Sequence, residues 1–312
     1  MTDTLKKYLF EDRQVKVQIA ELRDTWRHAQ SHVQYPPTVR RLLGELVAAA
    51  TLLAGNLKLD GSLVLQMHGD GPISLLVVEC RGDLSLRATV KLREGHELPE
   101  DGTLQSLLNT HGKGRFIVVL DPRDKLPGQT AYQGVVPLEG ETVAEVLEHY
   151  MLASEQLDTR LWLAADDAKA TGVLLQRLPG EGGHGTDTQL ASKDLDAWDR
   201  ACHLAGTLKA EELLSTDSDT IIRRLFWEES LIAFEPLPVR WHCPCSKQKV
   251  ADMLRMLGAK EVESILEERG KVDVTCDFCG KPYSFDPVDC AELFLGDPLK
   301  PAEDGSGTPT LH

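Results

Sequence analysis

Four cysteines near the C-terminal end of the chain have the type and spacing needed to hold a metal ion. They form a C-x-C pair, Cys243 and Cys245, and a C-x-x-C pair, Cys276 and Cys279, all within 37 residues. Two such pairs are typical of a tetrahedral zinc site made of four thiolates. The sequence therefore predicts that these four cysteines bind one Zn²⁺ per chain while the protein is reduced.

The same sulfurs can do redox chemistry. Zinc holds cysteine sulfur as the thiolate, which is its nucleophilic and oxidisable form, and closely spaced cysteines can form local disulfides that destroy the ligand set. A C-x-C disulfide closes a tighter ring than a C-x-x-C disulfide, so Cys276 and Cys279 are expected to pair more readily. The spacing alone leaves two interpretations open, a purely structural zinc knuckle and a redox switch.

The residues between the two pairs predict short helices and a hairpin. Ser246 can cap a helix that Gly258 ends. The apolar face of this helix is expected to carry Val250, Met253, Leu254 and Leu257. The pattern then predicts a helix from Ala259 to Arg269 that Gly270 ends, a strand from Val272 to Val274 and a second strand from Tyr283 to Phe285. So small a module buries little apolar surface of its own. Structural zinc can supply on the order of 10 kcal/mol of apparent folding free energy. Loss of the metal is therefore expected to unfold the module.

Other motifs in the sequence support catalysis, ligand binding or an alternative metal ligand less well than the four cysteines support a zinc site. A thioredoxin-like oxidoreductase also uses C-x-x-C, but within a βαβ pattern that this region lacks. His242 could replace a thiolate, yet four cysteines already fill a tetrahedral site. His111-Gly112-Lys113-Gly114 lacks the spacing of a phosphate loop and is interpreted as a turn. Ser154-Glu155-Gln156 has no histidine partner at an informative spacing, so we predict no catalytic residue and no enzyme.

Charge and composition exclude several classes of partner. The chain has 312 residues and a net charge of -15, which repels phosphate backbones and anionic lipids. Zinc knuckles can dock on RNA, but no basic stripe supports that alternative here. The longest mainly apolar run, Val47 to Ala54, is too short to span a bilayer. We therefore expect a cytoplasmic protein that binds neither nucleic acid nor membrane.

The periodicity of the remaining chain predicts an α+β first domain, residues 1–178, with an antiparallel sheet. Strands are expected at Gln14–Ala20, Ser62–His68, Ile73–Cys80, Leu84–Leu92, Arg115–Leu120 and Tyr132–Leu138. Helices are expected at Thr38–Gly55 and, from a capping box at Thr142, toward Gln156. A glycine-dense joint at Pro179–Gly185 opens a helical linker, residues 179–240, whose helical pattern extends to Arg240. Its short amphipathic helices must borrow stability from whatever they contact, so the linker is expected to be metastable. The zinc-binding redox-switch domain is placed at residues 241–290, and a partly disordered tail at 291–312.

Over nearly its whole length, the chain resembles heat-shock protein thirty-three, the redox-regulated bacterial holdase chaperone. Besides Cys-x-Cys-Ser and Cys-x-x-Cys, the matching pieces are Tyr35-Pro36, Leu42-Leu43-Gly44-Glu45, Leu57-Lys58-Leu59-Asp60-Gly61, Gln66-Met67-His68-Gly69-Asp70-Gly71-Pro72, Tyr132-Gln133-Gly134 and Ser154-Glu155-Gln156-Leu157.

The resemblance implies a two-layer α+β first domain, a metastable helical linker and a C-terminal zinc domain. It implies that Cys243 pairs with Cys245, and Cys276 with Cys279, on oxidation, which releases zinc and unfolds the linker. The opened form would bind unfolding client proteins without ATP and tend to form a homodimer. Two departures from the family pattern, Lys247-Gln248-Lys249 and the extra Cys290, bear on the sensitivity of the switch.

Overall fold

The structure is a computed structural model that describes residues 3–57, 60–124, 130–178 and 191–295. The chain divides into two compact units, residues 1–243 and residues 244–312. The first unit holds two sheets, and the second holds a two-stranded hairpin with helices. The predicted α+β class is confirmed. The glycine-dense joint at Pro179–Gly185 and the end of the tail, residues 296–312, lie outside the described residues.

Sheet A of the first unit is built from the N-terminal strands and from strands late in the chain. Its order is β10-β1-β2-β9-β8, with β11 also paired to β1, and every pairing is antiparallel. Its strands are β1 (Thr4–Phe10), β2 (Val15–Leu22), β8 (Thr159–Ala165), β9 (Ala170–Arg177), β10 (Leu231–Ala233) and β11 (Leu237–Pro238). The strand predicted at Gln14–Ala20 is therefore confirmed as β2.

Sheet B contains the predicted meander. Its order is β12-β5-β4-β3-β6-β7, and only the short β12 runs parallel to its neighbour, β5, among the described strands. Its strands are β3 (Gly61–His68), β4 (Ile73–Arg81), β5 (Ser85–Leu92), β6 (Arg115–Pro122), β7 (Tyr132–Pro137) and β12 (Arg240–Trp241). The five strands expected from turn signals and alternation are confirmed as β3 to β7.

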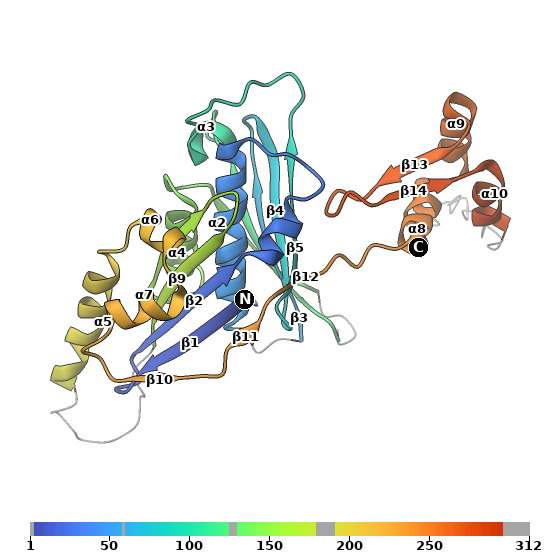
Figure 1. The fold of residues 1–312 in the computed structure, drawn as a ribbon. Helices are drawn as coiled ribbons and strands as arrows, with labels where there is room; N and C mark the ends of the chain where they lie inside the picture. The colour runs from blue at the N-terminus through green and yellow to red at the C-terminus, as the bar shows by residue number, and fades with distance from the viewer. Residues whose placement is uncertain (1–2, 58–59, 125–129, 179–190, 296–312) are drawn as a thin grey trace, which may run out of the picture. The chain divides into compact units, whose positions relative to one another are not determined.

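One long helix, α2 (Pro37–Ala54), lies between the two sheets (Figure 1). It begins with proline at its first position, where a missing N–H costs nothing, and ends at Gly55. The helix has almost no exposed face, because 14 of its 18 residues are buried. A Cβ on Gly44 would lie 2.3 Å from Cβ of Ala165, so glycine is what allows this close approach to sheet A.

Three shorter helices complete the core around α2. They are α1 (Asp24–Ala29), α3 (Leu104–Leu108) and α4 (Val143–Ala153). The Thr142 hydroxyl accepts a hydrogen bond from the Glu145 N–H at 3.2 Å, which confirms the predicted cap of α4. The helix ends before Gln156, the predicted end, and Gln156 takes a left-handed backbone with φ of 56° that cannot continue a helix.

Linker helices cover the face of sheet A that points away from α2 (Figure 1). They are α5 (Ala191–Ala205), α6 (Ala210–Ser215) and α7 (Ser218–Leu225). The prediction that helix extends to Arg240 is wrong, because three short strands occupy this segment: β10 at 231–233, β11 at 237–238 and β12 at 240–241. Pro236 and Pro238 cannot donate the N–H groups of a helix, and the segment pairs instead with the edges of both sheets. We call residues 230–242 the strap.

The second unit follows its predicted order closely. Its elements are α8 (Lys247–Leu257), α9 (Ala259–Arg269), β13 (Val272–Thr275), β14 (Pro282–Phe285) and α10 (Pro287–Leu295). Helix α10 includes residues 291–295, the first residues assigned to the tail, because Leu293 is buried and Phe294 packs on the same small core. No helix in the described ranges of either unit is long and apolar enough to cross a membrane.

Candidate metal centre

The four predicted ligands come together. The sulfur atoms of Cys243, Cys245, Cys276 and Cys279 all lie within 4.8 Å of one another, and all four residues are partly buried. Among the described residues, no other group of three or more potential ligands gathers in this way. His242 is not part of the cluster, and its backbone N–H donates to the Leu86 carbonyl at 2.9 Å.

The separation of the sulfurs fits a tetrahedral metal ion and not a disulfide. Four sulfurs about 2.3 Å from a central zinc ion lie roughly 3.8 Å from one another, whereas bonded sulfurs lie about 2.05 Å apart. Cys245 Sγ and Cys279 Sγ are 3.4 Å apart. All seven cysteines fall in the described ranges, and none of them forms a disulfide. The cluster has the donor set and the spacing of a four-thiolate site in its reduced form.

Local sequence signals bring the two pairs to one place. The Ser246 hydroxyl caps α8 by accepting from the Lys249 N–H at 3.2 Å, so the chain turns into a helix directly after Cys245. The C-x-x-C pair lies in the turn between β13 and β14. This turn is closed by Gly280 N–H donating to the Cys276 carbonyl at 2.8 Å, and Gly280 has a φ of 67° that favours glycine.

Tyr283 also belongs to the site, although its position in the sequence did not indicate this. Its hydroxyl donates a hydrogen bond to Cys245 Sγ at 3.1 Å, and its ring is buried in the core of the second unit. The hydrogen bond to Cys245 and burial both raise the pKa of the Tyr283 hydroxyl, so it stays protonated as a donor. A tyrosine seven residues after Cys276 gave no spacing signal, because the contact depends on the register of the hairpin.

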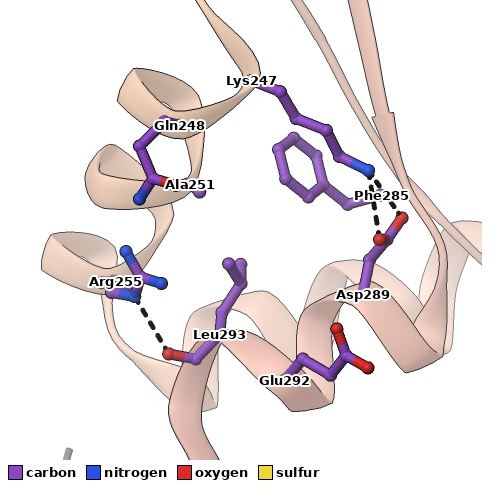
Figure 2. A pocket seen from close by; sticks show the side chains of 8 residues that line it. All are labelled: Lys247, Gln248, Ala251, Arg255, Phe285, Asp289, Glu292 and Leu293. Carbon is purple, nitrogen blue, oxygen red and sulfur yellow. Dashed lines mark hydrogen bonds and ion pairs between the residues drawn. The ribbon is translucent and has the colours of Figure 1, made fainter. Parts of the chain in front are cut away.

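Helix α10 is tied to α8 across a pocket of about 290 Å³ (Figure 2). Lys247 Nζ lies 3.1 Å from Asp289 Oδ1 and 5.1 Å from the centre of the Phe285 ring. At the other end of the pocket, Arg255 Nε donates to the Leu293 carbonyl at 3.0 Å. Lys247, one of the departures from the family pattern, therefore holds two helices of the cysteine-bearing unit together.

The other three cysteines do not have the surroundings of reactive thiols. Burial raises the pKa of the Cys80 thiol far above its usual range and that of Cys202 to about 11. Cys290 is 2% exposed in the core of the second unit, and burial together with Asp289 raises its pKa as well. Low thiolate content makes all three poor nucleophiles.

Two other motifs noted in the sequence have structural partners. The carboxylate of Asp70 accepts from the backbone N–H of His111 and of Lys113, at 3.2 and 2.9 Å, which confirms a turn. The Glu155 carboxylate accepts from the Tyr150 hydroxyl at 2.9 Å and so fixes the end of α4.

Comparisons with known proteins agree on one family. A family model described as Hsp33 protein matches residues 3–286. The 33 kDa chaperonin of Methylobacillus flagellatus is 44% identical over 305 residues, covering 97% of this chain and 98% of the relative. The 33 kDa chaperonin of Chromobacterium violaceum is 44% identical over 293 residues, covering 94% of each.

A solved structure has the same fold. The crystal structure of the 33 kDa chaperonin from Thermotoga maritima, an Hsp33 homologue, superposes with a TM-score of 0.77 and 22% sequence identity. The match covers 94% of this chain and 98% of that one. With the family match over most of its length and relatives at 44% identity, the chain belongs to the Hsp33 family.

Proposed function

We propose that this protein is a redox-regulated, ATP-independent chaperone that holds unfolding client proteins when its cysteines are oxidised. The observation that carries the proposal is the gathering of four sulfurs within 4.8 Å at the end of the strap. Family membership and the name chaperonin of its relatives support a client-binding, non-catalytic role.

In the reduced state, Cys243, Cys245, Cys276 and Cys279 are proposed to hold one Zn²⁺. A bound ion would keep these four sulfurs as thiolates. The Tyr283 hydroxyl orients Cys245. Four reduced thiols need a reducing compartment, so we place the protein in the cytoplasm.

Oxidation is proposed to convert each pair into a disulfide, Cys243 with Cys245 and Cys276 with Cys279. The thiolate of Cys276 or Cys279 attacks hydrogen peroxide, the O–O bond breaks, and a sulfenic acid and hydroxide form. The second thiolate of the pair then displaces hydroxide from the sulfenic sulfur, so that one S–S bond forms for each peroxide reduced. Two disulfides use all four ligand sulfurs, and the unit loses the metal on which its folding depends.

We keep the predicted division into a first domain (1–178), a linker (179–240), a redox-switch domain (241–290) and a tail (291–312). The linker is the proposed moving part. Helix α6 has six residues and α7 has eight, too short to be stable alone. Their buried apolar residues pack on sheet A in a core separate from the one around α2. The sheet residues of this second core are Phe10, Val15, Val17, Ile19, Ala164, Val173 and Leu175. Release of the linker would expose this apolar face to clients and, we propose, favour a homodimer.

The test is light scattering from a thermally aggregating client, with zinc release followed by a chelating dye. The zinc-loaded reduced protein should leave aggregation unchanged, and the protein oxidised by peroxide at elevated temperature should suppress it after releasing about one zinc per chain. The matched control is Cys202→Ser, which should keep both behaviours. Equal suppression of aggregation by reduced and oxidised protein would mean that the four cysteines form a purely structural zinc knuckle.

A further inference from the structure

The strap closes one edge of each sheet in the first unit. Through β10 and β11 it pairs with β1, the strand that would otherwise end sheet A, and through β12 it pairs with β5 of sheet B. The next residue after the strap is Cys243. One short segment that leads directly into the cysteine cluster therefore occupies the hydrogen-bonding edge of β1.

The pairing with β1 is antiparallel, and its register shifts by one residue between β10, where Tyr8 faces Ala233, and β11, where Thr4 faces Pro238. Phe234 N–H donates to the Lys7 carbonyl at 3.0 Å, and Glu11 N–H donates to the Ser230 carbonyl at 3.0 Å. Farther along, Val239 N–H donates to the Asp3 carbonyl at 2.9 Å. Because backbone groups alternate in direction along a strand, the odd-numbered residues of β1 present their N–H and C=O groups to the strap.

In β10, only Leu231 is partly buried, and it packs on the core that the linker helices cover. Ile232 is 42% exposed and Phe234 is 51% exposed, although both are large and apolar. The contact of β10 with β1 therefore combines backbone hydrogen bonds, which any extended polypeptide can make, with the packing of one apolar side chain, Leu231. Where β11 forms the outer edge, Pro238 occupies the position whose N–H would point away from β1, and proline offers no donor there.

We propose that β1, once the strap is released, binds an extended segment of an unfolded client chain as an added antiparallel strand. The inference rests on the proposed function, since it needs the oxidised linker to leave sheet A. Unpaired N–H and C=O groups along β1 require new partners. A client that has lost its own strand pairing offers them, and recognition through the backbone places little demand on client sequence.

The geometry joins this edge to the apolar face described above. The side chains of Tyr8 and Phe10 on β1 belong to the core that the linker helices cover, and Phe10 packs edge-on against Phe226 with ring centres 5.5 Å apart. A client strand added at β1 would place every second side chain on that same face. Backbone pairing would supply affinity, and the uncovered apolar face would accept the client's apolar side chains.

The experiment uses a fluorescent peptide with the sequence of residues 230–242 and the oxidised, full-length protein. One derivative is N-methylated at Phe234, whose N–H donates to Lys7, and the matched control is N-methylated at Ala233, whose N–H points the other way. Fluorescence anisotropy measures binding. Displacement of reduced, carboxymethylated α-lactalbumin, a permanently unfolded chain, measures competition with a client.

The unmodified and Ala233-methylated peptides should bind the oxidised protein alike and displace α-lactalbumin, and methylation at Phe234 should weaken binding by roughly tenfold or more. Equal binding of the two methylated peptides would contradict the inference. A peptide that dissociates a dimer of the oxidised protein but leaves α-lactalbumin bound would also contradict the inference. That result would mean that β1 pairs with the strap of a second copy and not with a client. Oxidised protein that binds no α-lactalbumin would instead contradict the proposed function, and this inference with it.

Discussion

At the scale of single residues, the Tyr283 hydroxyl is the contact that should tune the cysteine cluster. It donates to Cys245 Sγ at 3.1 Å, and groups that hydrogen-bond to metal ligands commonly change metal affinity by about 10- to 100-fold. Tyr283→Phe is expected to weaken zinc binding by about tenfold and to speed zinc release under peroxide. Competition with a chelating dye measures the affinity.

Tyr132→Phe, at an exposed position on β7, is the control and should leave zinc affinity unchanged. An unchanged affinity in Tyr283→Phe would show that the hydroxyl does not act on the ligand set.

Glu45 on α2 should make the first unit sensitive to pH. Burial raises the pKa of its carboxyl from 4.5 to about 7, against the opposing effect of Arg41. Because the folded-state pKa is the higher one, the folded state binds the proton more tightly, so stability falls as pH rises from about 4.5 to about 7. Glu45→Gln should remove this dependence and stabilise the unit at pH 8 by on the order of 2 kcal/mol.

Thermal unfolding of parent and variant at pH 5 and pH 8 measures the effect, with the exposed Glu139→Gln as the control. A parent that is equally stable at both pH values would rule out the assigned role of Glu45.

The cysteine ligands could be predicted from the sequence because their type and spacing are themselves the signal. Tyr283 could not be, because its contact with Cys245 arises from the register between β13 and β14 and from the turn that Gly280 closes.

At the scale of elements, Lys169 should anchor the linker. Its Nζ is almost fully buried and donates to the carbonyls of Leu213 and Thr216, at 2.8 and 2.7 Å, at the C-terminal end of α6. Lys169→Met leaves two carbonyls without their donor and should loosen the linker by roughly 2–3 kcal/mol. The linker should then lose protection from hydrogen exchange at a lower temperature, and less peroxide should activate the protein.

Lys6→Met is the matched control, because Lys6 also reaches a linker helix, through an ion pair with Asp219 at 2.7 Å. Asp219 is 61% exposed, so this ion pair is expected to contribute less than about 1 kcal/mol. Equal effects of the two substitutions would argue against a special role for Lys169.

Helices and strands whose bounds are set by nearby residues could be predicted from the sequence. Strands that form only by pairing with a distant part of the chain could not. Residues next to the helices themselves signal their bounds: Ser246 caps the start of α8, Gly258 ends α8, and Gly270 ends α9. Strand β10 has no comparable signal, because its partner β1 lies more than 200 residues earlier in the chain. The apolar face predicted for α8 was wrong for Met253 and Leu257, which are 43% and 50% exposed, whereas Leu254 is buried.

At the scale of the whole molecule, a continuous stretch of chain connects the cysteine cluster to the linker helices that cover the apolar face of sheet A. The strap ends at His242, Cys243 follows, and the linker helices before the strap cover sheet A. Sequence resemblance predicted the order of these parts. It did not reveal that part of the linker is extended and pairs with two sheet edges, since that pairing depends on the folded first unit.

The central claim is that loss of the cysteine site and loss of linker structure are coupled, and hydrogen exchange read by mass spectrometry tests it most directly. Reduced, zinc-loaded protein and peroxide-oxidised protein are compared at the same temperature. The account predicts that oxidation removes amide protection from residues 191–242 and 244–295, while β3, β4 and β6 of sheet B stay protected. Oxidised, zinc-free protein whose residues 191–242 remain as protected as in the reduced state would contradict it.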